Sequence, residues 1–122
     1  MANPNLVNVS SILGKSNGVQ LNTTTTTDII SCDSEKLVKV NSIIVANIDG
    51  SSAADVTVYF YDNSASHRTA IADAVTVPAK STLVVIGKDS PIYLEESDQI
   101  EAGASANGDL HLTISYEILD DA

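Results

Sequence analysis

The sequence predicts an all-β protein, an antiparallel β-sandwich with jelly-roll or Greek-key connections and an extended N-terminal segment. Val, Ile and Thr together make up 34 of the 122 residues, and β-branched side chains are stiff at χ1 and pack best on a pleated sheet. Apolar and polar residues alternate in runs of strand length. Turn residues separate these runs at intervals of roughly 8 to 12 residues, the spacing of a sandwich or barrel. Such short connections leave no room for the crossovers of a parallel sheet.

The clearest strand signal runs from Leu110 to Ile118, where every second residue is apolar and the residues between them are polar. Side chains alternate between the two faces of a strand, so this pattern predicts one buried and one solvated face. The segment Asp55 to Asp62 alternates in the same way and places Tyr59 and Tyr61 on its outer face. That face is therefore a candidate contact surface.

The segment Lys36 to Asp49 has strand character, but its second half is apolar at both parities. We therefore expect either a central strand covered on both sides or a β-bulge near Asn41 and Ser42. Asp-Gly at 49–50 and Asn-Gly at 107–108 predict turns, because these residue types tolerate positive φ. Four more strands are expected, the first two forming a pair that is broken at Pro78: Thr69 to Val77, Ser81 to Ile86, Ile92 to Leu94 and Gln99 to Ala104.

The first 35 residues differ from the rest, so we expect an N-terminal arm or edge strands (1–35) and a β-sandwich domain (36–122). Leu6 to Leu13 has weak strand character, Lys15 to Gly18 predicts a turn, and Thr23 to Thr27 is an unbroken threonine run. The segment is either an edge strand and loop of the same domain or an arm that adds a strand to a neighbouring subunit. Apolar residues of this segment, with the two tyrosines, form the candidate interface: Leu6, Val7, Val9, Ile12, Leu13, Val19, Leu21, Tyr59 and Tyr61.

The charge balance disfavours two classes of partner. With 16 acidic and 6 basic side chains the net charge is −10, whereas binding to nucleic acid or to anionic lipid requires clustered positive charge. No segment approaches the roughly 20 apolar residues of a membrane helix. The N-terminus lacks a basic start followed by an apolar stretch, so we expect the chain to fold where it is made.

No catalytic, cofactor or metal constellation is expected, and we predict that the protein is not an enzyme. His67 and His111 have no second histidine or cysteine at a metal-ligand spacing. The single cysteine, Cys32, cannot form an internal disulfide and follows two isoleucines, which favours a buried, inert thiol. Asp49 to Asp55 matches a calcium loop only loosely, so solvated turns are the better interpretation of the acidic clusters.

Several motifs follow one another in a distinctive order. Lys-x-x-Ser-Ile-x-Val-x-Asn-x-Asp-Gly starts at Lys39, Val-Pro-Ala-x-Ser-Thr-Leu at Val77, and Tyr-Leu-Glu-Glu-x-Asp at Tyr93. The closing stretch, Ser105 to Glu117, fits the same pattern. With these motifs the chain resembles small structural proteins of tailed bacteriophages, notably those that infect marine bacteria. The resemblance covers about two thirds of the chain, from Val40 to Asp62 and from Val75 to Leu119.

The resemblance implies a β-sandwich subunit of the virion, made in the cytoplasm of the bacterial host. Among virion locations we favour the capsid surface, as a decoration or cement protein that bridges copies of the major capsid protein or contacts another virion protein. A small acidic β domain with an extended N-terminal segment suits an outer clamp that oligomerises, with a trimer expected, and weak contacts at many equivalent sites add through multivalency. A neck, collar or tail component is the alternative. A module that binds host-surface glycans through Asp49 to Asp55 is a further alternative.

Overall fold

The computed structural model describes residues 3–24 and 27–120 of the chain. Within these residues it contains nine β-strands and no helix, so no helix is available that could cross a membrane, and the all-β prediction is confirmed. The strands are β1 (Ser11–Gln20), β2 (Thr27–Ser31), β3 (Leu37–Asn47), β4 (Ala54–Asp62), β5 (His67–Val77), β6 (Thr82–Ile86), β7 (Ile92–Leu94), β8 (Gln99–Ala104) and β9 (Leu110–Asp120).

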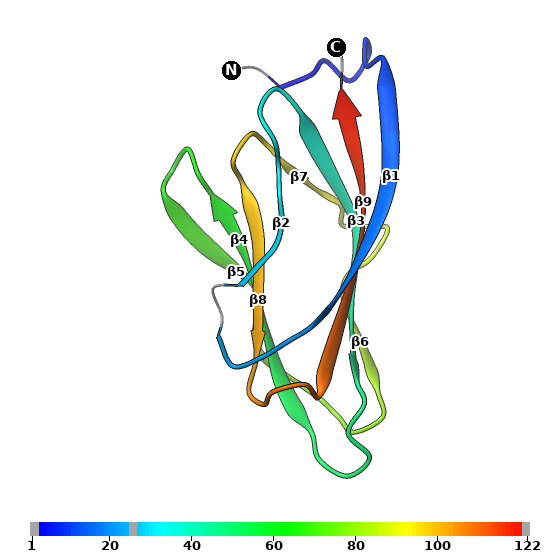
Figure 1. The fold of residues 1–122 in the computed structure, drawn as a ribbon, viewed down its shortest axis with the longest axis vertical. Helices are drawn as coiled ribbons and strands as arrows, with labels where there is room; N and C mark the ends of the chain where they lie inside the picture. Colours follow the sequence, from blue (N-terminus) through cyan, green and yellow to red (C-terminus); the bar gives the residue numbers. More distant parts are fainter. Residues whose placement is uncertain (1–2, 25–26, 121–122) are drawn as a thin grey trace.

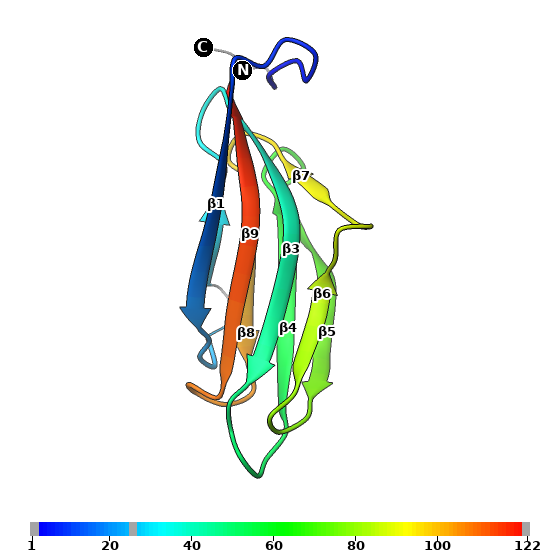
Figure 2. The same ribbon diagram turned by 90° about the vertical axis from the view of Figure 1, so that its right-hand side faces the viewer.

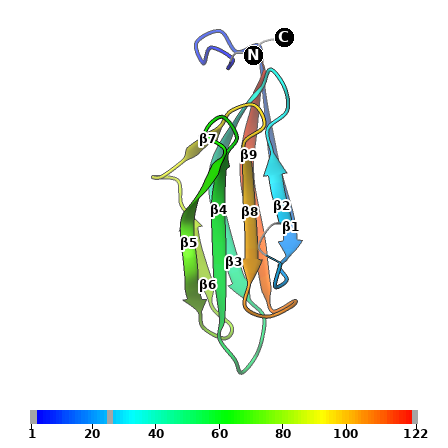
Figure 3. The same cartoon turned by 90° about the vertical axis from the view of Figure 1, so that its left-hand side faces the viewer.

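The strands form two antiparallel sheets that pack face to face (Figure 1). One sheet, here called the β9 sheet, has the order β1-β9-β3-β6, with β7 also paired to β3. The other, the β8 sheet, has the order β2-β8-β4-β5 (Figure 3). With β6 and β7 counted as one strand, both orders are those of a jelly roll. The predicted sandwich with jelly-roll wiring is therefore confirmed.

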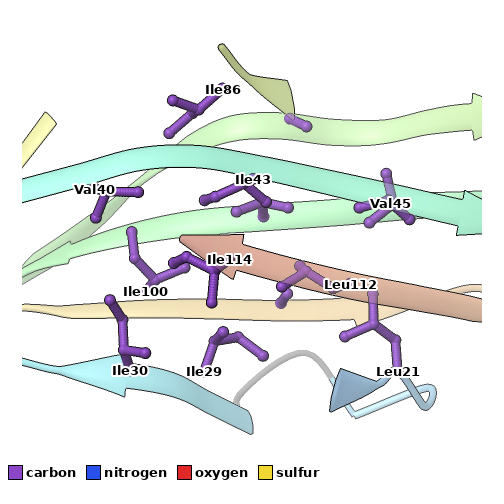
Figure 4. Close-up of a cluster of buried hydrophobic side chains, with 14 of the residues drawn as sticks. Leu21, Ile29, Ile30, Val40, Ile43, Val45, Ile86, Ile100, Leu112 and Ile114 are labelled. Atoms are coloured by element: carbon purple, nitrogen blue, oxygen red, sulfur yellow. The ribbon is translucent and has the colours of Figure 1, made fainter. Parts of the chain in front are cut away.

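The core lies between the two sheets and consists almost entirely of aliphatic side chains. Ile43 of β3 and Leu112 and Ile114 of β9 are fully buried, and they face Ile100 of β8 (Figure 4). Leu21, which follows β1, closes the same cluster at one side. Burial of each such side chain stabilises the fold by about 1.5 to 3 kcal/mol, so packing holds this sandwich without any disulfide among the described residues.

The central strand β3 contains the β-bulge that its mixed apolar pattern predicts. The register against β9 shifts between Val40 and Ser42. Because an extra residue inverts the alternation of side chains, Val40 and Ile43 both point into the core. Ile44 is partly exposed, so this strand has a bulge and is not covered on both faces.

The turn predicted at Lys15 to Gly18 is wrong. These residues lie inside β1, which pairs with β9 without interruption from Ser11↔Asp120 to Gln20↔His111. Gly, Ser and Asn favour turns through local conformational freedom, but ten residues of unbroken pairing with a central strand outweigh that preference. The weak strand expected from Leu6 to Leu13 begins only at Ser11.

The strands on either side of Pro78 exist as predicted, but they do not pair with each other. β5 pairs with β4 in the β8 sheet, and β6 pairs with β3 in the β9 sheet. The turn between them, closed by a hydrogen bond from the Ser81 N–H to the Pro78 carbonyl, therefore crosses from one sheet to the other. Alternation along each strand cannot tell a hairpin from such a corner, which explains the error.

Turns at the end of the sandwich where β3 ends are built around Asn and Asp side chains. The buried Asn47 donates to the carbonyls of Ser52 and Val77 at 3.0 and 2.9 Å and accepts the N–H of Asp49 at 2.9 Å. Asp49 in turn accepts the N–H of Ser51 at 2.9 Å. Gly108, in the other predicted turn, has φ +80°, a conformation that glycine adopts without strain.

Candidate interaction surfaces

The structure divides the candidate interface residues between two surfaces on different sheets. The first lies at the end of the sandwich where β1 begins and β9 ends, and it includes residues 3–10, here called the hook (Figure 2). The second lies on the outer face of the β8 sheet, where Tyr59 and Tyr61 project from β4. The prediction treats these residues as one candidate interface, whereas the fold places them on two separate surfaces.

The first surface, here called the hook-end surface, consists of four exposed apolar side chains. Leu6 and Val7 belong to the hook and are 52% and 89% exposed, and Ile12 and Leu13 at the start of β1 are 62% and 53% exposed. Ile12 and Leu13 are neighbours in a strand and point to opposite faces of β1, whereas Leu6 and Val7 both lie in the hook. The exposed pair Leu6 and Val7 is therefore the strongest candidate contact in the described chain.

The hook is held against the β9 sheet by its own contacts. Pro4 is buried, and Asn3 donates from Nδ2 to Glu95 Oε2 at 3.0 Å. A turn closes between the Asn8 N–H and the Asn5 carbonyl at 2.9 Å. Beside the hook lies a hollow of about 350 Å³, lined by Asn3, Pro4, Leu6, Leu37, Tyr93 and Glu95.

Three other residues of the predicted interface are not presented on the hook-end surface. Leu21 is only 2% exposed and belongs to the core, and Val19 is partly buried against the same cluster. Both point inward because they lie opposite Leu110 and Leu112 of β9, whose side chains fill the sandwich. Val9 is half-buried in the hook. In this fold Leu21 supports the structure and is not available to a partner.

The second surface combines the two tyrosines with an ion pair that sequence reasoning missed. Arg68 of β5 lies over the rings of Tyr59 and Tyr61, with its guanidinium carbon 5.9 and 5.4 Å from the ring centroids. Its Nε donates to Glu101 Oε1 at 2.8 Å and its Nη2 to Oε2 at 3.3 Å. Planar stacking and two-point pairing suit arginine far better than lysine.

Glu101 is buried although it carries a charge, because its neighbours supply donors. Besides Arg68, Gln99 donates to Glu101 Oε2 at 3.1 Å and to Asp28 Oδ1 at 3.0 Å when its amide is oriented to suit these acceptors. The hydrogen bond and the charge of Glu101 raise the pKa of Arg68 above its ordinary value. The cluster is thus a satisfied polar network that fixes the two tyrosine rings on the outer face.

The remaining candidate groups have structural partners or lie in solvent. His67 is exposed at the start of β5, and His111 lies on the polar face of β9. Asp49 and Asp55 accept hydrogen bonds from their own turn and from Thr76, at 2.9 and 2.8 Å respectively. Among residues 3–24 and 27–120, no three His, Cys, Asp or Glu side chains are grouped so that they could hold a metal ion.

Cys32 is buried as predicted, and its thiol donates to the Lys36 carbonyl at 3.2 Å. Burial raises the pKa of the thiol to about 11. Since only the thiolate reacts with iodoacetamide, we expect alkylation of the native chain at pH 8 to be at least tenfold slower than in urea. Mass spectrometry over time measures both rates. Equal rates would contradict this placement of Cys32.

In comparisons with known proteins, no family model matches the sequence, and no curated protein matches it significantly.

Proposed function

We propose that the chain is a non-enzymatic structural subunit of a tailed-phage virion that decorates the capsid and bridges its subunits. The motifs that start at Lys39, Val77 and Tyr93 support a virion role through the resemblance given above. The hook-end surface is the observation that carries the capsid contact. A decoration protein needs a contact site on a stable, small domain, and the jelly-roll sandwich with this surface at one end meets that need.

The hook itself carries no charged side chain, but acidic residues lie beside it. The first 27 residues contain one charged side chain, Lys15, whereas the rest of the chain carries all 16 acidic groups. Glu95, Glu96 and Asp98 line a hollow together with Asn3 of the hook, and Asn3 donates to Glu95 at 3.0 Å. The proposed contact therefore rests on the apolar side chains of the hook, and the neighbouring carboxylates favour a partner surface that is not acidic.

The proposed contact is tested by changing the two hook residues to aspartate together, Leu6→Asp with Val7→Asp. Both side chains are exposed, so the fold is expected to persist while occupancy falls at least tenfold, because many weak contacts of the same kind are lost at once. The assay is co-sedimentation with expanded, empty capsids assembled from the major capsid protein encoded in the same genome.

A matched control is Ile48→Asp, since Ile48 is 50% exposed and lies in the loop after β3, at the opposite end of the sandwich (Figure 1). The control is expected to bind capsids like the unchanged chain. Unchanged occupancy of the Leu6/Val7 variant would remove the hook from the proposal. If the unchanged chain does not sediment with capsids but binds purified tails or necks, the proposed location moves to the tail or the neck.

A further inference from the structure

The outer edge of β1 has the features of a strand that pairs with another chain. β1 is the terminal strand of the β9 sheet, and no other described strand pairs with its outer side. The strand is exposed or only half-buried along its whole length. Figure 2 shows β1 at the margin of the molecule, with the hook turned toward the β3 side. A row of unpaired backbone groups is a template for strand addition.

The other edge strands of the described chain are protected, and β1 is not. The register of β2 shifts next to Asp28, and the register of β6 against β3 shifts at Ile43/Ile44. β5 has two register shifts and places Ala74 at φ 49°, and β7 is only three residues long. Short strands and bulges are the usual devices that prevent edge pairing. β1 combines ten residues with an unbroken register.

The register identifies which backbone groups of β1 face the open edge. The N–H of Leu21 donates to the Leu110 carbonyl at 2.9 Å, so this pair and every second pair before it are hydrogen-bonded to β9. The residues between them direct N–H and C=O away from β9. These residues are Ile12, Gly14, Ser16, Gly18 and Gln20.

We propose that β1 pairs antiparallel with β1 of a second copy of this chain, about a two-fold axis at Ser16. In this register Ser16 lies opposite Ser16 of the second copy, Gly14 opposite Gly18, and Ile12 opposite Gln20. All five outward-facing residues of each copy then find hydrogen-bond partners. The two β9 sheets join into one continuous sheet, and the contact is isologous, as a two-fold axis requires.

The side chains of β1 are self-complementary in this register. On the outer face the glycines of one copy face the glycines of the other, and a Cβ added at either position would meet no atom within 4 Å in the single chain. On the other face Leu13 lies opposite Val19 of the second copy, and Lys15 opposite Asn17. Lys15 is the only charge on the strand, and no like charges lie directly opposite each other.

This pairing goes beyond the proposed attachment to capsids. It shares Ile12 and Leu13 with the hook-end surface but does not use Leu6 and Val7, the residues changed in the capsid test, so either proposal can fail without the other. It also differs from the trimer expected from the resemblance, because β1 pairing about a two-fold axis closes with two chains. The mass of the protein in solution is the first test of the proposed dimer. We expect sedimentation equilibrium to give twice 12.8 kDa at high concentration and dissociation on dilution. A monomer at every concentration, or a trimer, would overturn the proposal.

Cysteine substitutions test the register. Opposite residues of a hydrogen-bonded pair have Cα atoms about 5.5 Å apart, within disulfide range. Ser16→Cys is therefore expected to cross-link with itself under oxidation. Gly14→Cys and Gly18→Cys are each expected to form no disulfide alone and to cross-link when mixed, because these positions face each other. Cross-linking of Gly14→Cys alone as fast as Ser16→Cys would overturn this register.

Charge at position 17 gives a second test that does not depend on cysteine. Asn17→Asp places a carboxylate opposite Lys15 of the second copy at two symmetric positions, whereas Asn17→Lys places a like charge there. We expect the dissociation constants of these variants to differ by about tenfold, the Asp variant being tighter. Equal constants, or tighter association of the Lys variant, would contradict the pairing.

Discussion

Replacing Asp98 by alanine is expected to lower the free energy of unfolding by about 3 kcal/mol, because two backbone donors would lose their partner. Asp98 is buried; its Oδ1 accepts the N–H of Asn63 and its Oδ2 that of Glu95, both at 2.9 Å. The carboxylate thereby joins the β4–β5 hairpin to the loop before β8. Urea denaturation followed by far-ultraviolet circular dichroism measures the loss.

The matched variant is Asp98→Asn, which keeps one acceptor oxygen and replaces the other by an amide nitrogen. It is expected to destabilise the protein by roughly half as much as the alanine variant, since one of the two N–H groups keeps its partner. An alanine variant as stable as the unchanged chain would show that water satisfies both donors.

Replacing Leu112 by alanine is expected to cost about 3 kcal/mol of stability and to lower the melting temperature by about 10 °C. Leu112 is fully buried between the two sheets on the central strand β9. Truncation removes apolar contacts and leaves a cavity that the surrounding strands cannot fill without breaking their pairing. Differential scanning calorimetry gives both quantities.

Val84→Ala is the control for this prediction. Val84 is 60% exposed on the outer face of β6, so its truncation is expected to change stability by less than about 0.5 kcal/mol. Equal effects of the two truncations would mean that the core does not lie between the sheets as described.

Seven of the nine strands could be predicted from alternation alone, since a half-buried strand has a period of two residues. The run from Leu110 to Ile118 and the mixed parity of Lys36 to Asp49 even indicate which faces are buried and where the bulge lies. Pairing partners could not be predicted in this way. Whether a turn such as the one after Pro78 closes a hairpin or a corner depends on contacts between distant segments.

β1 could not be recognised because its own residues do not favour a strand. Gly14, Gly18 and the polar residues between them are extended because β9 pairs with them, and that contact joins positions about a hundred residues apart. The same distance explains why the prediction of Leu21 as an interface residue fails: local sequence does not indicate what covers this side chain.

Only part of the second surface could be predicted from the sequence. Tyr59 and Tyr61 follow from alternation along β4, but their partners Arg68 and Glu101 lie on other strands. A signal for this pair was present, since Arg68 is the only arginine in the chain and Glu101 interrupts an otherwise small and apolar run. Neither fact indicates by itself that the two side chains meet.

The position of β9 in its sheet determines the order in which the protein can fold. β9 lies between β1 and β3, yet it follows both along the chain, and Ser11 pairs with Asp120. During synthesis β1 and β3 leave the ribosome long before the strand that joins them, so the β9 sheet cannot form until nearly the whole sandwich has been made. Contacts of such sequence separation close slowly, and the waiting strands expose apolar faces that chaperones bind and that other chains can capture.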